Sequence, residues 1–238
     1  MRIEVLADAD AVASRAAAII AGEARHAVAA RGRFVMAVSG GHTPWVMLRA
    51  LADQDVPWAS VHIFQVDERV APEGHADRNL THLRASLLEH APLPAGQIYA
   101  MPVEIPDLQN AAARYAAQLE KIAGVPPVLD VVHLGLGPDG HTASLVPGDP
   151  VLDVTDRHVA VTGVYQGRNR LTITYPVINR ARLILWLVTG SEKVPMYKRL
   201  RTADQSIPAG RVVQNNAVLL ADSAAAGERT GQTERDIA

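Results

Sequence analysis

The chain alternates short apolar runs with helix-like segments along nearly its whole length. The apolar runs are bounded by turn residues, as buried strands are, and the clearest cover residues 34–38, 61–66, 129–136, 183–188 and 217–220. Helices are predicted between them, one from a cap at Asp8 or Asp10 to about residue 30 and others at about 45–51, 77–89, 108–122 and 191–201. This order predicts an α/β fold with a mostly parallel, Rossmann-like sheet and helices on both faces.

Shorter segments complete this prediction. Residues 2–6, 98–101, 159–164 and 171–174 are expected strands, and residues 176–180 an expected helical turn. No internal repeat, low-complexity linker or change of composition divides the chain, so we expect a single α/β catalytic domain over residues 1–222. Residues 223–238 are small, polar and charged, which predicts a flexible C-terminal tail.

Composition narrows the classes of function. The chain has no cysteine, which excludes disulfides and thiolate chemistry and is typical of a reducing compartment. A net charge of -2 implies no general affinity for nucleic acid or for an anionic membrane. No apolar stretch approaches the ~18 residues that span a bilayer, and the acidic N-terminus is unlike a signal peptide. We therefore expect a cytoplasmic protein with no nucleic-acid or membrane partner.

Residues 129–136 deliver two polar side chains to the end of an expected buried strand. The run stops at glycines, and Asp139 and His141 follow in a tight turn. Ligands of parallel sheets bind beyond the carboxyl ends of the strands, where an imidazole can take a proton from water near neutral pH. The alternative is that Asp139 forms a bend and His141 caps the next turn. The residues alone support both interpretations about equally.

Two related motifs are rejected. Residues 135–140 match G-x-G-x-x-G, but Pro147 and Gly148 interrupt the long helix that a dinucleotide site needs. Metal binding is not predicted, because His133 and His141 lie on either side of the turn without an H-x-x-x-H pattern or a carboxylate triad.

Two other strand ends have the composition of an anion site. Ser39, Gly40, Gly41 and Thr43 lie between an expected strand and an expected helix. Successive glycines there let backbone N–H groups converge on a phosphate, and the helix N-terminus adds a partial positive charge. This context favours phosphate binding over a plain sharp turn. Lys193 follows another apolar strand, where its ammonium could complete the site as a point charge.

The remaining candidates are weaker on their own. Asp67 and Arg69 end the 61–66 run, and the plainer interpretation is a capping acid and a solvated arginine. The functional interpretation makes Asp67 a polar group in the cleft and Arg69 a charge-stabilising donor. Arg168 and Arg170 belong to a basic last third of the chain, most of which is expected to be a solvated face.

Four blocks together resemble the 6-phosphogluconolactonase family, of the same superfamily as glucosamine-6-phosphate deaminase. They are AVSGGHTP, VDERVAPEGHADRN, LGLGPDGHTASLVPG, and the pair RLTITYPVIN and TGSEKVPMYKRL, in this order. The resemblance implies the fold of the glucosamine-6-phosphate deaminase and ribose-5-phosphate isomerase group. It also implies hydrolysis of 6-phospho-D-glucono-1,5-lactone in the pentose phosphate pathway, without a cofactor.

The resemblance implies roles for single residues. His141 would be the general base, Asp139 its neighbour and Arg69 the arginine of the cleft. The 6-phosphate would be held by the glycine turn with Thr43, by Lys193 and by Arg170. The chain departs from the family pattern at His42, where a small hydroxyl residue is usual, and at residues 166–169, where prolines are common. Arg168 could therefore replace or assist Arg170.

Two other functions stay open. Deaminases carry a glutamate shortly after the D-G-H turn, whereas residues 142–146 contain no acid, which favours the lactonase. A non-catalytic sugar-phosphate sensor is disfavoured by the retained Asp139, His141 and Arg69 and by the lack of a basic arm. The expected partner is a small phosphosugar lactone, and the expected state is a monomer or weak homo-oligomer.

Overall fold

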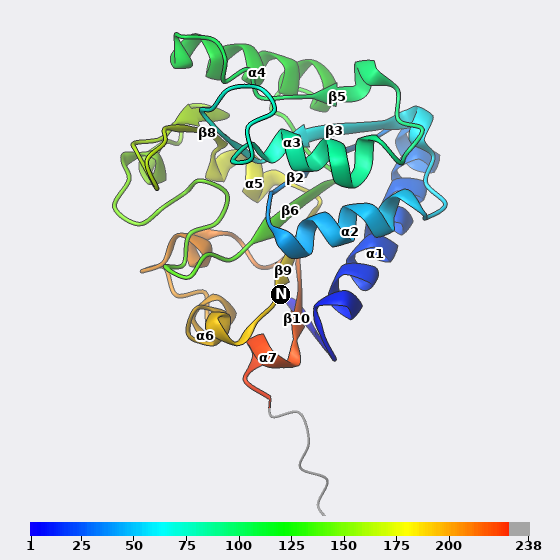
Figure 1. Cartoon of the computed structure of the whole chain (residues 1–238), viewed down its shortest axis with the longest axis vertical. Helices are drawn as coiled ribbons and strands as arrows, with labels where there is room; N and C mark the ends of the chain where they lie inside the picture. The colour runs from blue at the N-terminus through cyan, green and yellow to red at the C-terminus, as the bar shows by residue number, and fades with distance from the viewer. Residues whose placement is uncertain (229–238) are drawn as a thin grey trace, which may run out of the picture.

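A seven-stranded parallel sheet forms the centre of the protein (Figure 1). The computed structural model describes residues 1–228. The strands, in order across the sheet, are β1 (Arg2–Leu6), β10 (Ala217–Asp222), β9 (Leu183–Val188), β6 (Val131–Gly135), β2 (Phe34–Val38), β3 (Val61–Gln65) and β5 (Ile98–Tyr99). Every neighbouring pair is parallel, so the predicted mostly parallel sheet is confirmed.

The strand order reverses between β2 and β6, in the middle of the sheet. From β2 the chain continues outward to β3 and β5, whereas from β6 it continues to β9 and β10 on the other side. The backbone pairing between β2 and β6 extends as far as Ala37 and Val132. Beyond it, the amide of Ser39 donates to Nδ1 of His133 at 3.2 Å, and the Ser39 hydroxyl donates to the His133 carbonyl at 2.9 Å. A crevice beyond such a reversal is where α/β proteins bind ligands.

Helices cover both faces of this sheet. On one face lie α1 (Ala9–Arg31), α2 (His42–Ala52), α3 (Asn79–Leu83) and the π-helical turn η2 (Arg84–Leu88), and on the other α4 (Leu108–Ala123), α5 (Tyr175–Arg180) and α6 (Val194–Arg201). Alternate residues of a strand point to opposite faces. In β2, accordingly, Phe34 and Met36 join the core under α1, while Val35 and Ala37 join the core under α4.

Short helical turns and a cap complete the framework. The turns are η1 (Trp58–Ser60), η3 (Ala95–Gln97), η4 (Pro150–Asp153), η5 (Ser191–Lys193), η6 (Pro208–Arg211) and α7 (Ser223–Ala226). Of the two caps predicted for α1, Asp8 is the one used, because its carboxylate accepts the amide of Ala11 at 2.8 Å.

A second, three-stranded antiparallel sheet lies beside the first, and the sequence does not predict it. It contains β4 (Asp67–Arg69), β8 (Arg170–Ile173) and β7 (Val159–Val161). Asp67 and Arg69 were expected as the end of the 61–66 strand, but they form a strand of their own. They do so because their backbone pairs with β8, which comes much later in the chain.

Several predicted boundaries also shift: strand β7 ends at Val161 instead of residue 164, and strand β5 at Tyr99 instead of residue 101. Helix α2 begins at His42 instead of about residue 45, so Thr43 lies in its first turn. The predicted flexible tail begins with α7, because the Asp222 carboxylate accepts the amide of Ala225 at 2.7 Å and caps a helical turn. Residues 229–238 of that tail lie outside the described residues, and the single domain over residues 1–222 stays a prediction. Within residues 1–228, no helix is both long and apolar enough to cross a membrane.

Candidate active site

A cavity of about 410 Å³ opens at the carboxyl ends of β2, β6 and β9. It lies where the strand order reverses, as expected for an α/β sheet. Most of the side chains and turns predicted for the site line it: Ser39, Gly40, Gly41, Thr43, Asp67, Arg69, His141, Arg170 and Lys193. Segments that are far apart in the sequence therefore meet in one place.

His141 and Asp139 form a hydrogen-bonded pair in the turn after β6. Nδ1 of His141 lies 2.5 Å from Oδ1 of Asp139, which also accepts the His141 amide at 3.1 Å. Burial alone would raise the pKa of Asp139, but the hydrogen bonds and charge of His141 outweigh it and leave that pKa lowered. Asp139 is therefore a carboxylate that can only accept, so in the neutral imidazole the hydrogen is on Nδ1 and the lone pair on Nε2.

The absence of a side chain at Gly137 leaves room for the His141 imidazole. A Cβ on Gly137 would lie 2.1 Å from Nδ1 of His141, far closer than real contacts. The ring thus packs directly against the backbone of the turn. On the other side, the phenol of Tyr165 donates to Oδ2 of Asp139 at 3.0 Å.

The glycine turn after β2 is held by its neighbours. Ser39 is fixed by His133, and burial lowers the pKa of this histidine to about 3, which keeps the ring neutral. A Cβ on Gly40 would lie 2.0 Å from the side-chain oxygen of Asn79, so only glycine fits there. The turn leads into α2, an eleven-residue helix with Gly41 at its N-cap and no acid in its first turn. Backbone N–H groups at such a helix start favour an anion.

Two hydroxyls and an ammonium complete this end of the cavity. The Thr43 hydroxyl lies 2.7 Å from that of Thr189, which follows β9, so α2 and β9 are joined at the cavity. Lys193 lies on the next turn, with 21% of its side chain exposed and its Nζ 4.0 Å from a carboxylate oxygen of Glu192. This arrangement can bind a phosphate through backbone amides, hydroxyls and one cation.

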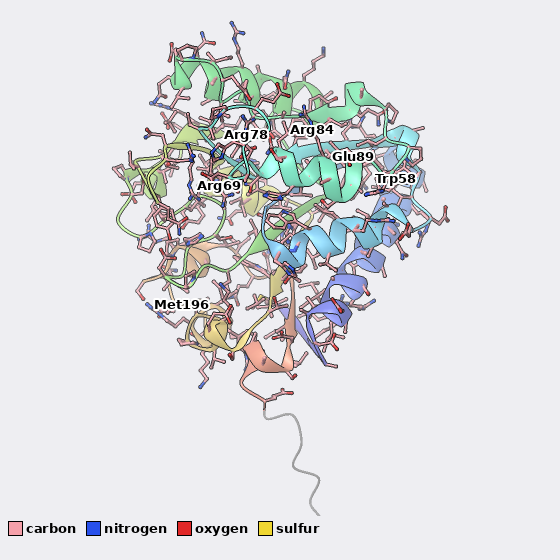
Figure 2. The ribbon with its side chains drawn as sticks, viewed as in Figure 1. Trp58, Arg69, Arg78, Arg84, Glu89 and Met196 are labelled. Atoms are coloured by element: carbon pink, nitrogen blue, oxygen red, sulfur yellow. The ribbon has the colours of Figure 1, made fainter. Side chains whose placement is uncertain are left out.

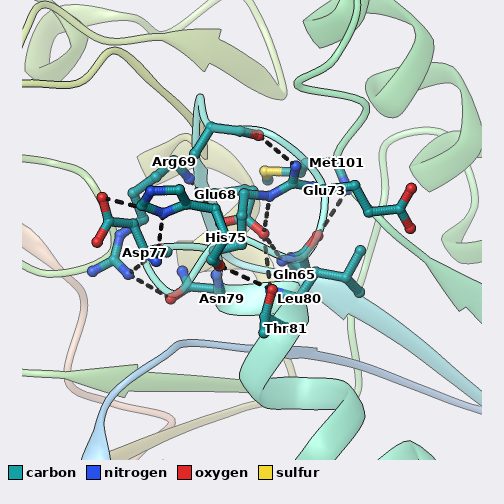
Figure 3. A network of polar contacts seen from close by, with 12 residues as sticks. Gln65, Glu68, Arg69, Glu73, His75, Asp77, Asn79, Leu80, Thr81 and Met101 are labelled. Atoms are coloured by element: carbon teal, nitrogen blue, oxygen red, sulfur yellow. Dashed lines mark hydrogen bonds and ion pairs between the residues drawn. The ribbon is translucent and has the colours of Figure 1, made fainter.

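Arg69 is positioned by a buried polar network that starts from Glu68 (Figure 3). Oε1 of Glu68 accepts the amides of Arg69 and Asn79, each at 2.8 Å, and Oε2 accepts the amide of Leu80 at 2.9 Å. Arg78 forms an ion pair with this carboxylate, with 3.1 Å between Nε and Oε2. Figure 2 shows Arg69 and Arg78 close together beside α3. The network joins β4 to the start of α3.

Asn79 connects this network to the cavity. Its side-chain oxygen accepts from a terminal nitrogen of Arg69 at 2.9 Å, and its Nδ2 donates to the carbonyl of Asp67 at 2.9 Å. The carboxylate of Asp67 in turn accepts the hydroxyl of Ser144 at 2.6 Å. Arg69 and Asp67 therefore have fixed places in the cavity.

The two candidate arginines of the 168–170 segment have different surroundings. Arg170 lines the cavity and donates to Gln166 at 3.0 Å, and burial together with the charge of Arg69 lowers the pKa of its guanidinium. Arg168 is not among the residues that line the cavity, because its Nε donates to the Asp77 carboxylate at 2.6 Å. Within residues 1–228, the buried Nε–H groups of Arg69 and Arg170 donate to no protein atom.

Sequence reasoning missed several cavity residues. Thr189 directly follows β9, so the rule that located Lys193 could have found it. Asn79 and Gln166 carry no local signal, because they reach the cavity only through tertiary contacts. The same holds for Tyr165, which contacts Asp139 without lining the cavity.

Comparisons with known proteins identify the family of this chain. The family model described as "Glucosamine-6-phosphate isomerases/6-phosphogluconolactonase" matches residues 7–220. The chain belongs to this family. The resemblance in sequence and the fold expected from it are thereby confirmed.

Relatives from several organisms extend this finding. A 6-phosphogluconolactonase of Nostoc sp. is 37% identical over 234 residues, which cover 95% of this chain and 97% of that protein. Its counterpart from Synechocystis sp. is 39% identical over 196 residues, or 81% of each. Among solved structures, that of Trypanosoma brucei 6-phosphogluconolactonase superposes with a TM-score of 0.84 at 25% identity, covering 95% of this chain and 97% of the other.

Proposed function

We propose that this protein is a 6-phosphogluconolactonase, which hydrolyses 6-phospho-D-glucono-1,5-lactone to 6-phosphogluconate. One observation carries the proposal: a single cavity joins the His141–Asp139 pair to the glycine turn and Lys193. A phosphosugar lactone has a dianion at one end and an electrophilic carbonyl at the other, so it needs this combination. The 6-phosphogluconolactonases of Nostoc and Synechocystis, at 37% and 39% identity, support the same substrate.

The phosphate is proposed to anchor the substrate. Backbone amides of residues 39–43, the hydroxyl of Thr43 and the ammonium of Lys193 bind it, and Arg170 adds a second positive charge. Arg168 is a weaker candidate, since Asp77 already holds its guanidinium. Binding at this remote group orients the lactone carbonyl toward the other end of the cavity.

His141 is proposed to act as the general base. Its Nε2 takes a proton from water, and the oxygen of that water bonds to C1 of the lactone. Negative charge develops on the C1 oxygen, near the guanidinium of Arg69, which Asn79 and the backbone of Asp77 hold in place. The bond from C1 to the ring oxygen then breaks, and His141 returns its proton to that oxygen. Asp67 accepts hydrogen bonds from Asn79 and Ser144 and so holds these side chains in place.

A coupled assay tests the proposal. The phosphorylated lactone is generated fresh, and acid release is followed with the wild type and with His141→Ala. We expect the wild type to accelerate hydrolysis and the variant to lose about 10²–10⁴-fold in kcat, the usual contribution of a general base. His26→Ala, which changes an exposed histidine of α1, is the matched control and should keep full activity.

The outcomes separate the alternatives. Full turnover by His141→Ala would remove His141 from the mechanism. Ammonia release from glucosamine 6-phosphate by the wild type would point to a deaminase. Binding of 6-phosphogluconate without any lactone turnover would point to a sugar-phosphate sensor.

A further inference from the structure

A tight hairpin turn brings one more side chain to the His141–Asp139 pair. The amides and carbonyls of Tyr165 and Arg168 are bonded to each other at 3.0 and 3.3 Å. Gln166 and Gly167 between them have φ angles of 51° and 78°, as a two-residue hairpin turn with two left-handed positions requires. The turn follows β7 and leads into β8.

The hairpin is anchored on the protein, so its tip has a defined position. Arg168 pairs with Asp77, and the amide of Val70 donates to the carbonyl of Asn169 at 3.0 Å. The guanidinium of Arg170 lies over the ring of Tyr165, with its central carbon 4.9 Å from the ring centroid. Tyr165 is therefore fixed by its own turn and by a stacked cation.

The phenol of Tyr165 reaches the side of Asp139 that His141 leaves open. It donates to Oδ2 at 3.0 Å, while Oδ1 accepts from the amide and ring of His141. The Tyr165 oxygen also lies 3.4 Å from Nδ1 of His141, and the two rings meet edge to face at 5.4 Å. Burial and the neighbouring carboxylate raise the pKa of Tyr165, so the phenol keeps its proton and remains a donor.

We propose that Tyr165 is a positioning residue for lactone hydrolysis. It holds the Asp139 carboxylate in the orientation in which that carboxylate fixes the His141 ring. The inference rests on the proposed function and deepens it. Rotation of Asp139 would break at least one of these bonds, so the carboxylate and the His141 ring bonded to it keep their orientation at the cavity. The phenol also takes up part of the carboxylate charge, so the carboxylate stabilises a protonated imidazole less strongly.

The charged groups around this trio are those bonded to it and those that line the cavity with His141. The cavity holds Asp67, Arg69, Arg170, Glu192 and Lys193. Asp139 is faced by His141 and Tyr165, and Tyr165 by Asp139 and Arg170. Behind the turn, Gly140 packs against the apolar side chains of Ile207 and Met196. Tyr165→Phe leaves all of these charges in place, so a change in its pH profile reports the loss of the phenol's bond to Asp139.

The test is Tyr165→Phe, which keeps the ring and removes the hydroxyl. We expect kcat to fall about tenfold, well short of the ~10²–10⁴-fold that a general base contributes, with KM changed less than about twofold. We also expect the acidic limb of the kcat profile to move to higher pH, because a fuller carboxylate charge favours the protonated imidazole. A structural role alone would not move this limb.

Two further variants sharpen the test. Tyr99→Phe removes a phenol that bonds Nδ1 of His62 at 3.0 Å, outside the cavity, and should leave kcat and the pH profile unchanged. If Tyr165 acts through Asp139, adding Tyr165→Phe to Asp139→Asn should cost almost nothing more. Unfolding temperatures of all variants show whether each has folded.

Each outcome decides. An unchanged kcat and pH profile in Tyr165→Phe would overturn the inference, and so would an equal loss in the Asp139→Asn background. Neither result would touch the proposed function, because wild-type turnover tests that function separately. The positioning role is supported if Tyr165→Phe lowers kcat in the wild type but not in the Asp139→Asn background, and if the acidic limb of the kcat profile shifts.

Discussion

Replacing Glu68 by glutamine should strongly destabilise the protein, although the two side chains have nearly the same shape. The Glu68 side chain is fully buried, and its ion-pair partner Arg78 is 1% exposed. Both carboxylate oxygens accept N–H groups: Oε1 accepts the amides of Arg69 and Asn79, and Oε2 those of Leu80 and the Gln65 side chain. Whichever oxygen becomes an NH₂ group, two donors lose their acceptor.

The geometry sets the magnitude. A buried donor left without a partner costs about 1–3 kcal/mol, and there are two of them. Breaking one side of a buried ion pair costs about 3–5 kcal/mol, which agrees with that sum. For a chain of this size each kcal/mol lowers the midpoint of thermal unfolding by about 2–4 °C, so we expect a drop of roughly 6–20 °C. Activity should fall too, because Arg69 and Asn79 lose their anchor.

Glu104→Gln is the matched control. Glu104 pairs with the same Arg78, but 49% of its side chain is exposed. Solvent screens such a pair, so its loss should cost at most about 1 kcal/mol. Thermal and urea unfolding of both variants measures the difference. If the two variants unfold at the same temperature, Glu68 is not the residue that organises this network.

Two further predictions concern the neighbours of the cavity. Gly137→Ala should lower kcat at least about 10²-fold while keeping affinity for 6-phosphogluconate, because the new Cβ displaces His141, the proposed base. Gly22→Ala in α1, where a Cβ would meet nothing within 4 Å, is the control. Unchanged turnover in Gly137→Ala would contradict the packing argument. Burial lowers the pKa of His133 to about 3, whereas an unfolded histidine protonates near 6.5. Acid therefore favours the unfolded chain between these values, and His133→Gln should remove a slope of about 1.4 kcal/mol per pH unit from the unfolding free energy, which urea titrations from pH 7 to 4 would detect.

Several features of the fold could be predicted because they are local. The strands of the large sheet are short apolar runs, and their burial on both faces needs no knowledge of distant partners. The start of α1 at Asp8 depends on a carboxylate three residues from the amide that it accepts. The glycine turn, His141 and Lys193 were found by one rule, that chemistry collects beyond the carboxyl ends of parallel strands.

Tertiary structure alone decided the rest, because it depends on which distant segments meet. Strand β4 exists through pairing with β8, and nothing near Asp67 in the sequence indicates that partner. Arg168 and Arg170 are equivalent in the sequence. In the structure Asp77 pairs with Arg168, whereas Arg170 lines the cavity. Tyr165 meets Asp139 across 26 residues because a hairpin turn points it there. The sequence by itself determined which elements form and where their ends carry chemistry, whereas side-chain partners follow from packing, which no local pattern encodes.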